Sequence, residues 1–137
     1  MTGVLPFGLP LWAASLVVRP RVRRVMCPGL ADNPGHRLAA AQMNGHFGAM
    51  VNFEVDGGFR AARQVVESTR LFQLAVSLGA VESLIEQPAA MSHASYDTAD
   101  REAHGITDGL IRPSVGLEEG DDLRAELQQA LARKSVV

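Results

Sequence analysis

The chain is poor in the two side chains that most often form crosslinks or covalent adducts. Its 137 residues include one cysteine, Cys27, and one lysine, Lys134, and the other twelve basic residues are arginines. A single cysteine excludes an intramolecular disulfide and suits a reducing cytoplasm. Cys27 stands before Pro28 and Gly29 in a predicted turn with no partner motif, so we interpret it as structural and not as a nucleophile.

Patterns for metal, phosphate and nucleic-acid binding are also lacking. No two histidines share a helical turn beside a carboxylate, so we expect no metal site. No glycine-rich loop ends in Gly-Lys-Ser/Thr. The net charge of -2 gives no overall basic field that would attract nucleic acid. The arginines between residues 19 and 24 alternate with other residues, which is typical of a half-exposed strand. A nucleic-acid-binding arm is the alternative interpretation. The histidines are His36, His46, His93 and His104.

Long apolar runs are limited to the uncharged stretch 3–18. It is shorter than the roughly 20 residues of a membrane span, and it contains Pro6 and Pro10. Positive charges follow this stretch, whereas a secretory signal carries them in front. We therefore expect no membrane segment, and we divide the chain into an apolar N-terminal segment, 1–21, buried or frayed, and a domain, 22–137.

The rest of the chain alternates helix and strand patterns. Helices are predicted at about 34–43, from 59 to about 71, between 97 and 105, and near the C-terminus, where every third or fourth residue is apolar. Strands are predicted at 50–55, as two short strands or one bent strand within 74–85, and after Gly109. This alternation indicates one α/β domain with a small sheet covered by helices.

Two polar side chains in these elements are candidates for binding an anion. Arg112 lies in the last predicted strand, facing away from Ile111 and Val115. A guanidinium on a rigid strand can hold a carboxylate through two parallel hydrogen bonds, and a solvated strand arginine is the alternative. Ser77 precedes Leu78 at a strand-to-turn junction, where its hydroxyl and nearby amides could donate to an anion, or where it is an ordinary turn residue.

Several motifs resemble one enzyme family. The segment from Leu74 to Ser95 contains Ser-Leu-Gly and Met-Ser-His-Ala, and the segment from Gly105 to Glu118 contains Leu-Ile-Arg. Together with the stretch around Cys27, where an aromatic residue is common in the family, they resemble the C-terminal domain of the pyridoxal-phosphate (PLP) enzymes of Cys/Met metabolism. This group includes cystathionine γ-synthase, cystathionine γ-lyase and methionine γ-lyase, and the likeness spans roughly residues 22 to 133.

The resemblance implies a fold and a set of site residues. It implies a mostly antiparallel sheet covered by helices, as in the C-terminal subdomain of fold-type I PLP enzymes. In the family, the residues at the positions of Ser77 and Arg112 bind the substrate α-carboxylate, and by analogy Ser92 supports the orientation of Arg112. The residue before the serine is commonly glutamate in cystathionine-handling members and valine in methionine γ-lyases, so Val76 suggests the latter.

The resemblance also implies a cofactor that this chain cannot hold covalently. Family members bind PLP as a Schiff base on a lysine and use it as an electron sink for γ-elimination or γ-replacement on sulfur amino acids. Lys134 is outside any motif like the family's Ser-x-Thr-Lys segment, and no segment matches the cofactor domain. We therefore expect no catalytic residue here, and a C-terminal part of an enzyme that is inactive alone.

The expected partners follow from the same resemblance. They are a sulfur-containing amino acid and a further subunit, either a second copy or a full-length homologue. A stand-alone module that docks on a full-length homologue, and a free amino-acid binder that uses Ser77 and Arg112, are the alternatives. Pro113 departs from the family, which commonly has an apolar residue with a backbone N–H there. Proline removes a ladder donor, which a strand tolerates best at an edge, so it puts the pairing of this strand in question more than the role of Arg112.

Overall fold

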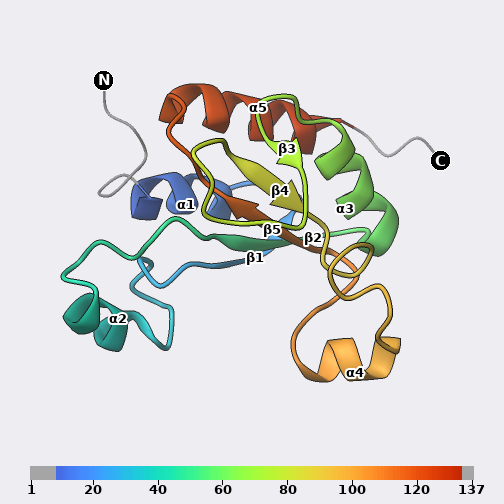
Figure 1. Ribbon diagram of the computed structural model, residues 1–137, viewed down its shortest axis with the longest axis horizontal. Coiled ribbons are helices and arrows are strands. Elements are labelled where there is room, and N and C mark those ends of the chain that lie inside the picture. The colour runs from blue at the N-terminus through green and yellow to red at the C-terminus, as the bar shows by residue number, and fades with distance from the viewer. Residues whose placement is uncertain (1–8, 134–137) are drawn as a thin grey trace.

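A five-stranded sheet organises the molecule (Figure 1). The computed structural model describes residues 9–133. Three neighbouring strand pairs are antiparallel and one, β3 with β4, is parallel, so the expectation of a mostly antiparallel sheet is confirmed and the sheet as a whole is mixed. The strands, in the sheet order β1-β2-β5-β4-β3, are β1 (Val22–Met26), β2 (Asn52–Val55), β5 (Leu110–Ser114), β4 (Leu84–Glu86) and β3 (Gln73–Leu74).

Three helices cover one face of the sheet. They are α1 (Leu9–Val17), α3 (Gly58–Glu67) and α5 (Gly120–Ala132), and their buried side chains join those of β2, β4 and β5 in one hydrophobic cluster. Two short helices, α2 (His36–Gln42) and α4 (Thr98–Ala103), lie apart from the sheet at opposite ends of the view in Figure 1. Helix α3 ends four residues before the predicted end, because the backbone N–H groups of Arg70, Leu71 and Phe72 donate to the Glu126 carboxylate of α5 and not to carbonyls of α3.

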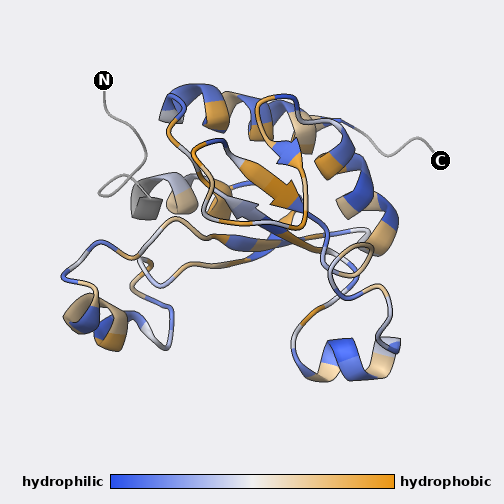
Figure 2. Ribbon diagram, viewed as in Figure 1, coloured by the Kyte–Doolittle hydropathy of each residue, from blue (hydrophilic) through white to orange (hydrophobic). Residues whose placement is uncertain are grey.

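The hydrophobic core lies between these helices and the sheet. Figure 2 shows hydrophobic residues along β4, and both hydrophobic and hydrophilic residues on α3 and α5, as expected for helices with one buried side. Trp12, Ala13 and Leu16 of α1 are buried, so the described part of the apolar N-terminal segment contributes to the core. The part of that segment before residue 9 lies outside the described residues. Within residues 9–133, no helix is long and apolar enough to cross a membrane.

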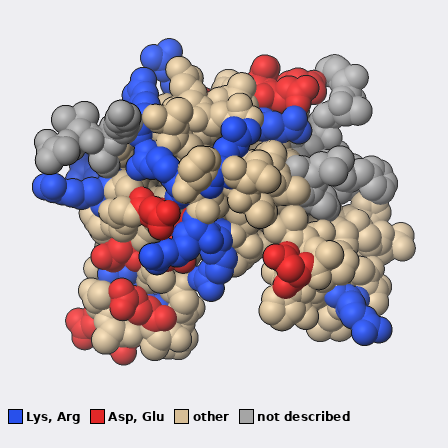
Figure 3. All heavy atoms as spheres, turned by 180° about the vertical axis from the view of Figure 1, so that it is seen from behind, with Lys and Arg blue, Asp and Glu red and all other residues tan. Residues whose placement is uncertain are grey.

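Strand β2 is buried on both faces, whereas its sequence pattern predicts burial on one. Phe53 and Val55 face the core, and Glu54, on the other face, is only 7% exposed. Arg23 and Arg24 of β1 approach the Glu54 carboxylate, and the Thr107 hydroxyl donates to it. Figure 3, which views the molecule from behind, shows basic and acidic side chains close together on that surface.

Pro113 lies in a paired strand that is not at an edge of the sheet. β5 is the central strand, between β2 and β4. The Pro113 carbonyl accepts a hydrogen bond from Val51 N at 3.3 Å, so the ring nitrogen of Pro113 also faces that side, because the N and C=O of a strand residue point to the same neighbour. Opposite Pro113 the chain has not yet entered β2, and β5 pairs with it only through the isolated bridge between Met50 and Ser114. The backbone N–H that proline lacks is therefore not needed for a regular strand pair at this position.

Candidate carboxylate-binding site

Arg112 lies in the middle of the central strand and is ion-paired. Its side chain is 23% exposed, and its Nη2 lies 2.6 Å from Oε1 of Glu86, whose side chain is 1% exposed. The two residues are partners in the antiparallel register of β4 and β5, so their side chains project from the same face of the sheet. The arginine is therefore held by a buried anion and is not a freely solvated strand side chain.

The loop that carries Ser77 is attached to β5 at two points. Arg112 Nη2 donates to the Val76 carbonyl at 2.9 Å, and Gly79 N donates to the Ser114 hydroxyl at 2.9 Å. Arg112 and Ser114 are two residues apart on a strand and so lie on one face. Ser77 is exposed between these two attachments, and the described residues give its hydroxyl no hydrogen-bond partner.

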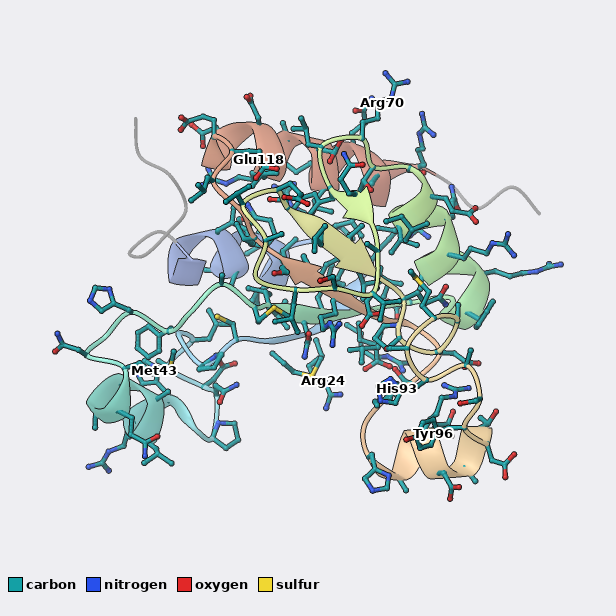
Figure 4. The ribbon with its side chains drawn as sticks, viewed as in Figure 1. Arg24, Met43, Arg70, His93, Tyr96 and Glu118 are labelled. Atoms are coloured by element: carbon teal, nitrogen blue, oxygen red, sulfur yellow. The ribbon has the colours of Figure 1, made fainter. Side chains whose placement is uncertain are left out.

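Ser92 reaches the same carboxylate as Arg112. Its hydroxyl donates to Glu86 Oε1 at 3.2 Å and lies 2.9 Å from Nδ1 of His93. Figure 4 shows His93 near Tyr96, with ring centroids 5.4 Å apart. The fold thus joins Ser92 and Arg112 through Glu86, while the binding of a carboxylate by Arg112 and Ser77 stays a prediction.

Glu86 and Ser114 are the site residues that sequence reasoning missed. Glu86 stands in the Leu74–Ser95 motif, but its pairing with Arg112 depends on the register between strands 26 residues apart. One sequence signal could have indicated Glu86. It is a single carboxylate at the end of the apolar stretch that forms β4, and a charge in a buried strand needs a partner of opposite charge. Ser114 gave no signal, because alternation predicts its face and not its bond to Gly79.

The arrangement presents a guanidinium and a nearby exposed hydroxyl, groups that suit an anion. The described residues contain no lysine, since Lys134 lies outside them, so they do not fit PLP as a covalent cofactor. Within residues 9–133, no three His, Cys, Asp or Glu side chains are placed to hold a metal ion. Cys27 is fully buried, and burial raises the pKa of its thiol although backbone N–H groups of Gly29 and Leu30 act to lower it, so the thiol stays protonated near neutral pH.

The comparisons with known proteins agree on one kind of enzyme. The chain is 50% identical over 114 residues to an L-methionine gamma-lyase of Fusobacterium nucleatum subsp. polymorphum, an alignment that covers 83% of this chain and 29% of that protein. It is also 50% identical over 112 residues to a cystathionine beta-lyase of Coxiella burnetii, and this alignment covers 82% of this chain and 29% of that protein. The chain therefore spans less than a third of the length of these curated relatives.

A solved structure extends the likeness to the fold. A cystathionine gamma synthase from Xanthomonas oryzae pv. oryzae, in complex with aminoacrylate and cysteine, superposes with a TM-score of 0.80 at 46% identity, covering 90% of this chain and 33% of that chain. This likeness assigns the molecule to the class of α/β domains that form part of larger PLP-dependent enzymes. The chain belongs to the family described as Cys/Met metabolism PLP-dependent enzymes, whose model matches residues 12–132.

Proposed function

We propose that this chain is the C-terminal, substrate-carboxylate-binding part of a PLP-dependent γ-elimination or γ-replacement enzyme of sulfur amino-acid metabolism, and that it is inactive alone. In this proposal, Arg112 and the loop serine Ser77 hold the α-carboxylate of a sulfur-containing amino acid. The observation that carries it is the position of Arg112, ion-paired to buried Glu86 and bonded to the loop that carries Ser77. Fixing the carboxylate would set the rest of the amino acid at one place, which is how positioning lowers a barrier.

The remainder of the proposed enzyme supplies the cofactor and its lysine. The described residues offer no amine for a Schiff base, and the chain spans 29% of the length of its lyase relatives. Purified chain mixed with micromolar PLP should therefore show no saturable Schiff-base absorbance. A saturable band at those concentrations would contradict the proposed division of labour.

The substrate-binding role is best tested in a graft. Residues 12–132 would replace the matched segment of the methionine gamma-lyase from Fusobacterium nucleatum subsp. polymorphum, which is 50% identical. The graft should turn over L-methionine or L-cystathionine in a PLP-dependent manner. A folded graft without turnover would count against the proposal.

Arg112→Lys in that graft tests the residue itself. Lysine keeps the charge beside Glu86 but lacks the planar fork, so the KM for the amino acid should rise about 100-fold, equivalent to roughly 3 kcal/mol. Arg60→Lys, an exposed position on α3, is the matched control and should leave the KM unchanged. An unchanged KM for Arg112→Lys would remove Arg112 from the proposed site.

The reaction type is a finer part of the proposal. Val76 favours methionine γ-lyase activity, because the family commonly has glutamate there in cystathionine-handling members. In the graft, Val76→Glu should raise the ratio of kcat/KM for cystathionine to that for methionine. A ratio that does not change would leave Val76 without a role in selectivity.

The second candidate function is an interaction module that docks on a full-length homologue. Exposed apolar side chains favour it, since Leu74, Val76, Leu78 and Val81 are each 48–70% exposed in one stretch of chain. A pull-down with the full-length Fusobacterium enzyme tests this function. Retention that Val81→Lys abolishes would support it, and no retention would exclude it.

A further inference from the structure

The proposed function uses the ion pair of Arg112 with the buried Glu86 carboxylate as an observation but gives Glu86 itself no part in binding. Glu86 Oε1 accepts from Arg112 Nη2 at 2.6 Å and from the Ser92 hydroxyl at 3.2 Å, and the Glu86 side chain is 1% exposed. Its other oxygen, Oε2, is buried and has no hydrogen-bond partner. A charge kept inside at this cost must be compensated by its contacts, and the strongest of these is with Arg112.

The hydrogens of the Arg112 guanidinium are unevenly used. Nη2 carries two hydrogens and has two acceptors, Glu86 Oε1 and the Val76 carbonyl at 2.9 Å. The described residues provide no acceptor for Nε or Nη1. A carboxylate that binds a guanidinium through two parallel bonds uses Nη2 together with Nε or Nη1, so one of the two present contacts of Nη2 must give way.

The two contacts differ in strength. The Glu86 contact is charge-assisted, buried, and fixed by the register of β4 and β5, whereas the Val76 carbonyl is neutral and belongs to an exposed loop residue. Both bonds have the ionised guanidinium as donor, but only the Glu86 contact joins it to an opposite charge, and burial strengthens that attraction. The exchangeable contact is therefore the one with Val76.

We propose that Glu86 is the positioning residue of Arg112, and that an incoming α-carboxylate displaces the Val76 carbonyl while Glu86 keeps its hold on Nη2. This inference rests on the proposed function of Arg112. It also links binding to the loop, because the Val76 carbonyl and the Ser77 N–H belong to one peptide group. Loss of the Arg112 contact removes one bond from this peptide group and changes the surroundings of its N–H, so carboxylate binding and a change at Ser77 occur together.

The positioning part is tested without any ligand. In the full 137-residue chain labelled with ¹⁵N, the Arg112 guanidinium should rotate slowly about its Cζ–N bonds and give separate Nη signals. Glu86→Leu should average them. Glu86→Gln keeps an oxygen for Nη2 and for Ser92, so it should restore slow rotation. Arg101, which is ion-paired to Asp108 at 2.8 Å, is the internal reference and should be the same in all three proteins.

The displacement part is tested with sodium acetate as the probe and sodium chloride at equal ionic strength as the control. In the unmutated chain, acetate should shift the Arg112 Nε and Ser77 amide signals with one Kd. Glu86→Leu should weaken that Kd by about tenfold, and Glu86→Gln by about threefold or less.

Two results would overturn these statements, and they differ. If Glu86→Leu leaves both the slow rotation and the acetate Kd unchanged while Arg112→Lys weakens binding, the positioning role is wrong and the proposed function stands. If Glu86→Leu frees the guanidinium but acetate shifts neither signal in the unmutated chain, the carboxylate-binding function of Arg112 is wrong.

Discussion

At the scale of single residues, Glu118 shows how a carboxylate ties two segments together. It accepts from Ser83 N and from the Ser83 hydroxyl, each at 2.7 Å, and Gly116 N donates to that hydroxyl at 2.8 Å. The start of β4 is thereby joined to the turn after β5. Figure 4 shows Glu118 at the end of the molecule where α5 begins.

This cluster predicts a loss of stability in acid. Burial raises the pKa of Glu118, but the backbone and hydroxyl bonds from Ser83 outweigh it, so the pKa lies below the ordinary value of 4.5. A carboxylate with a lowered folded-state pKa stabilises the protein above its unfolded-state pKa, and this contribution is lost as the pH falls through the folded-state value. As the pH is lowered below about 4.5, the free energy of unfolding, measured with urea, should decrease more steeply for the unmutated protein than for Glu118→Gln. Parallel pH profiles for the two proteins would contradict the assignment.

Gly116 is required by a close approach of two backbone segments. A Cβ at this position would lie 2.3 Å from the Val81 carbonyl oxygen. Gly116→Ala should therefore lower the free energy of unfolding by about 1–3 kcal/mol, the usual effect of overpacking. Gly35→Ala is the control, since its Cβ would meet only the Asn33 side chain at 3.4 Å. Equal effects of both substitutions would show that the close approach relaxes freely.

At the scale of elements, one carboxylate of α5 holds the turn after α3. Glu126 accepts three backbone N–H groups, from Arg70 at 2.6 Å, Leu71 at 2.8 Å and Phe72 at 3.0 Å. These donors follow the end of α3 and have no partner within that helix. Figure 4 shows Arg70 beside α5, which agrees with this contact.

Removing the negative charge of Glu126 should loosen that junction. In Glu126→Gln one oxygen becomes an amide group that faces backbone donors, so the free energy of unfolding should fall by about 1–3 kcal/mol. Urea denaturation measures the change, and Glu102→Gln, at an exposed position of α4, is the matched control. A Glu126 variant as stable as the control would mean that water replaces the carboxylate at no cost.

At the scale of the whole molecule, the segment that follows the edge strand β3 exposes apolar side chains. Val76 is 48% exposed, Leu78 57% and Val81 70%, all in the segment that follows the edge strand β3. Such a surface favours association with another polypeptide.

The chain should therefore self-associate at high concentration. In sedimentation velocity the apparent mass should rise above 14.7 kDa as the concentration increases, and Val81→Lys should reduce the rise. Val18→Lys is the control, because Val18 is 75% exposed but lies after α1 and away from this edge. A single species of 14.7 kDa at all concentrations would show that the edge does not pair with itself.

Local patterns in the sequence were sufficient for most of the elements. The alternation around Phe53, the spacing of apolar residues in α5 and the cap at Asp97 predict elements that the structure contains. These signals depend only on neighbours within one or two turns of chain. The same locality explains the errors. The end of α3 is set by the Glu126 carboxylate of α5, and the burial of Glu54 is compensated by arginines of another strand.

The sequence by itself determined the family, the alternation of helix and strand, and the choice of Arg112 and Ser77 as candidates. Only the tertiary structure decided that β5 is central and that Glu86, Ser92 and Arg112 form one network. The physical reason is that strand order and register depend on long-range pairing, which a local pattern does not encode. Glu86 lies 26 residues before Arg112 in the sequence, and the two can form an ion pair only because the register of β4 and β5 places them opposite each other.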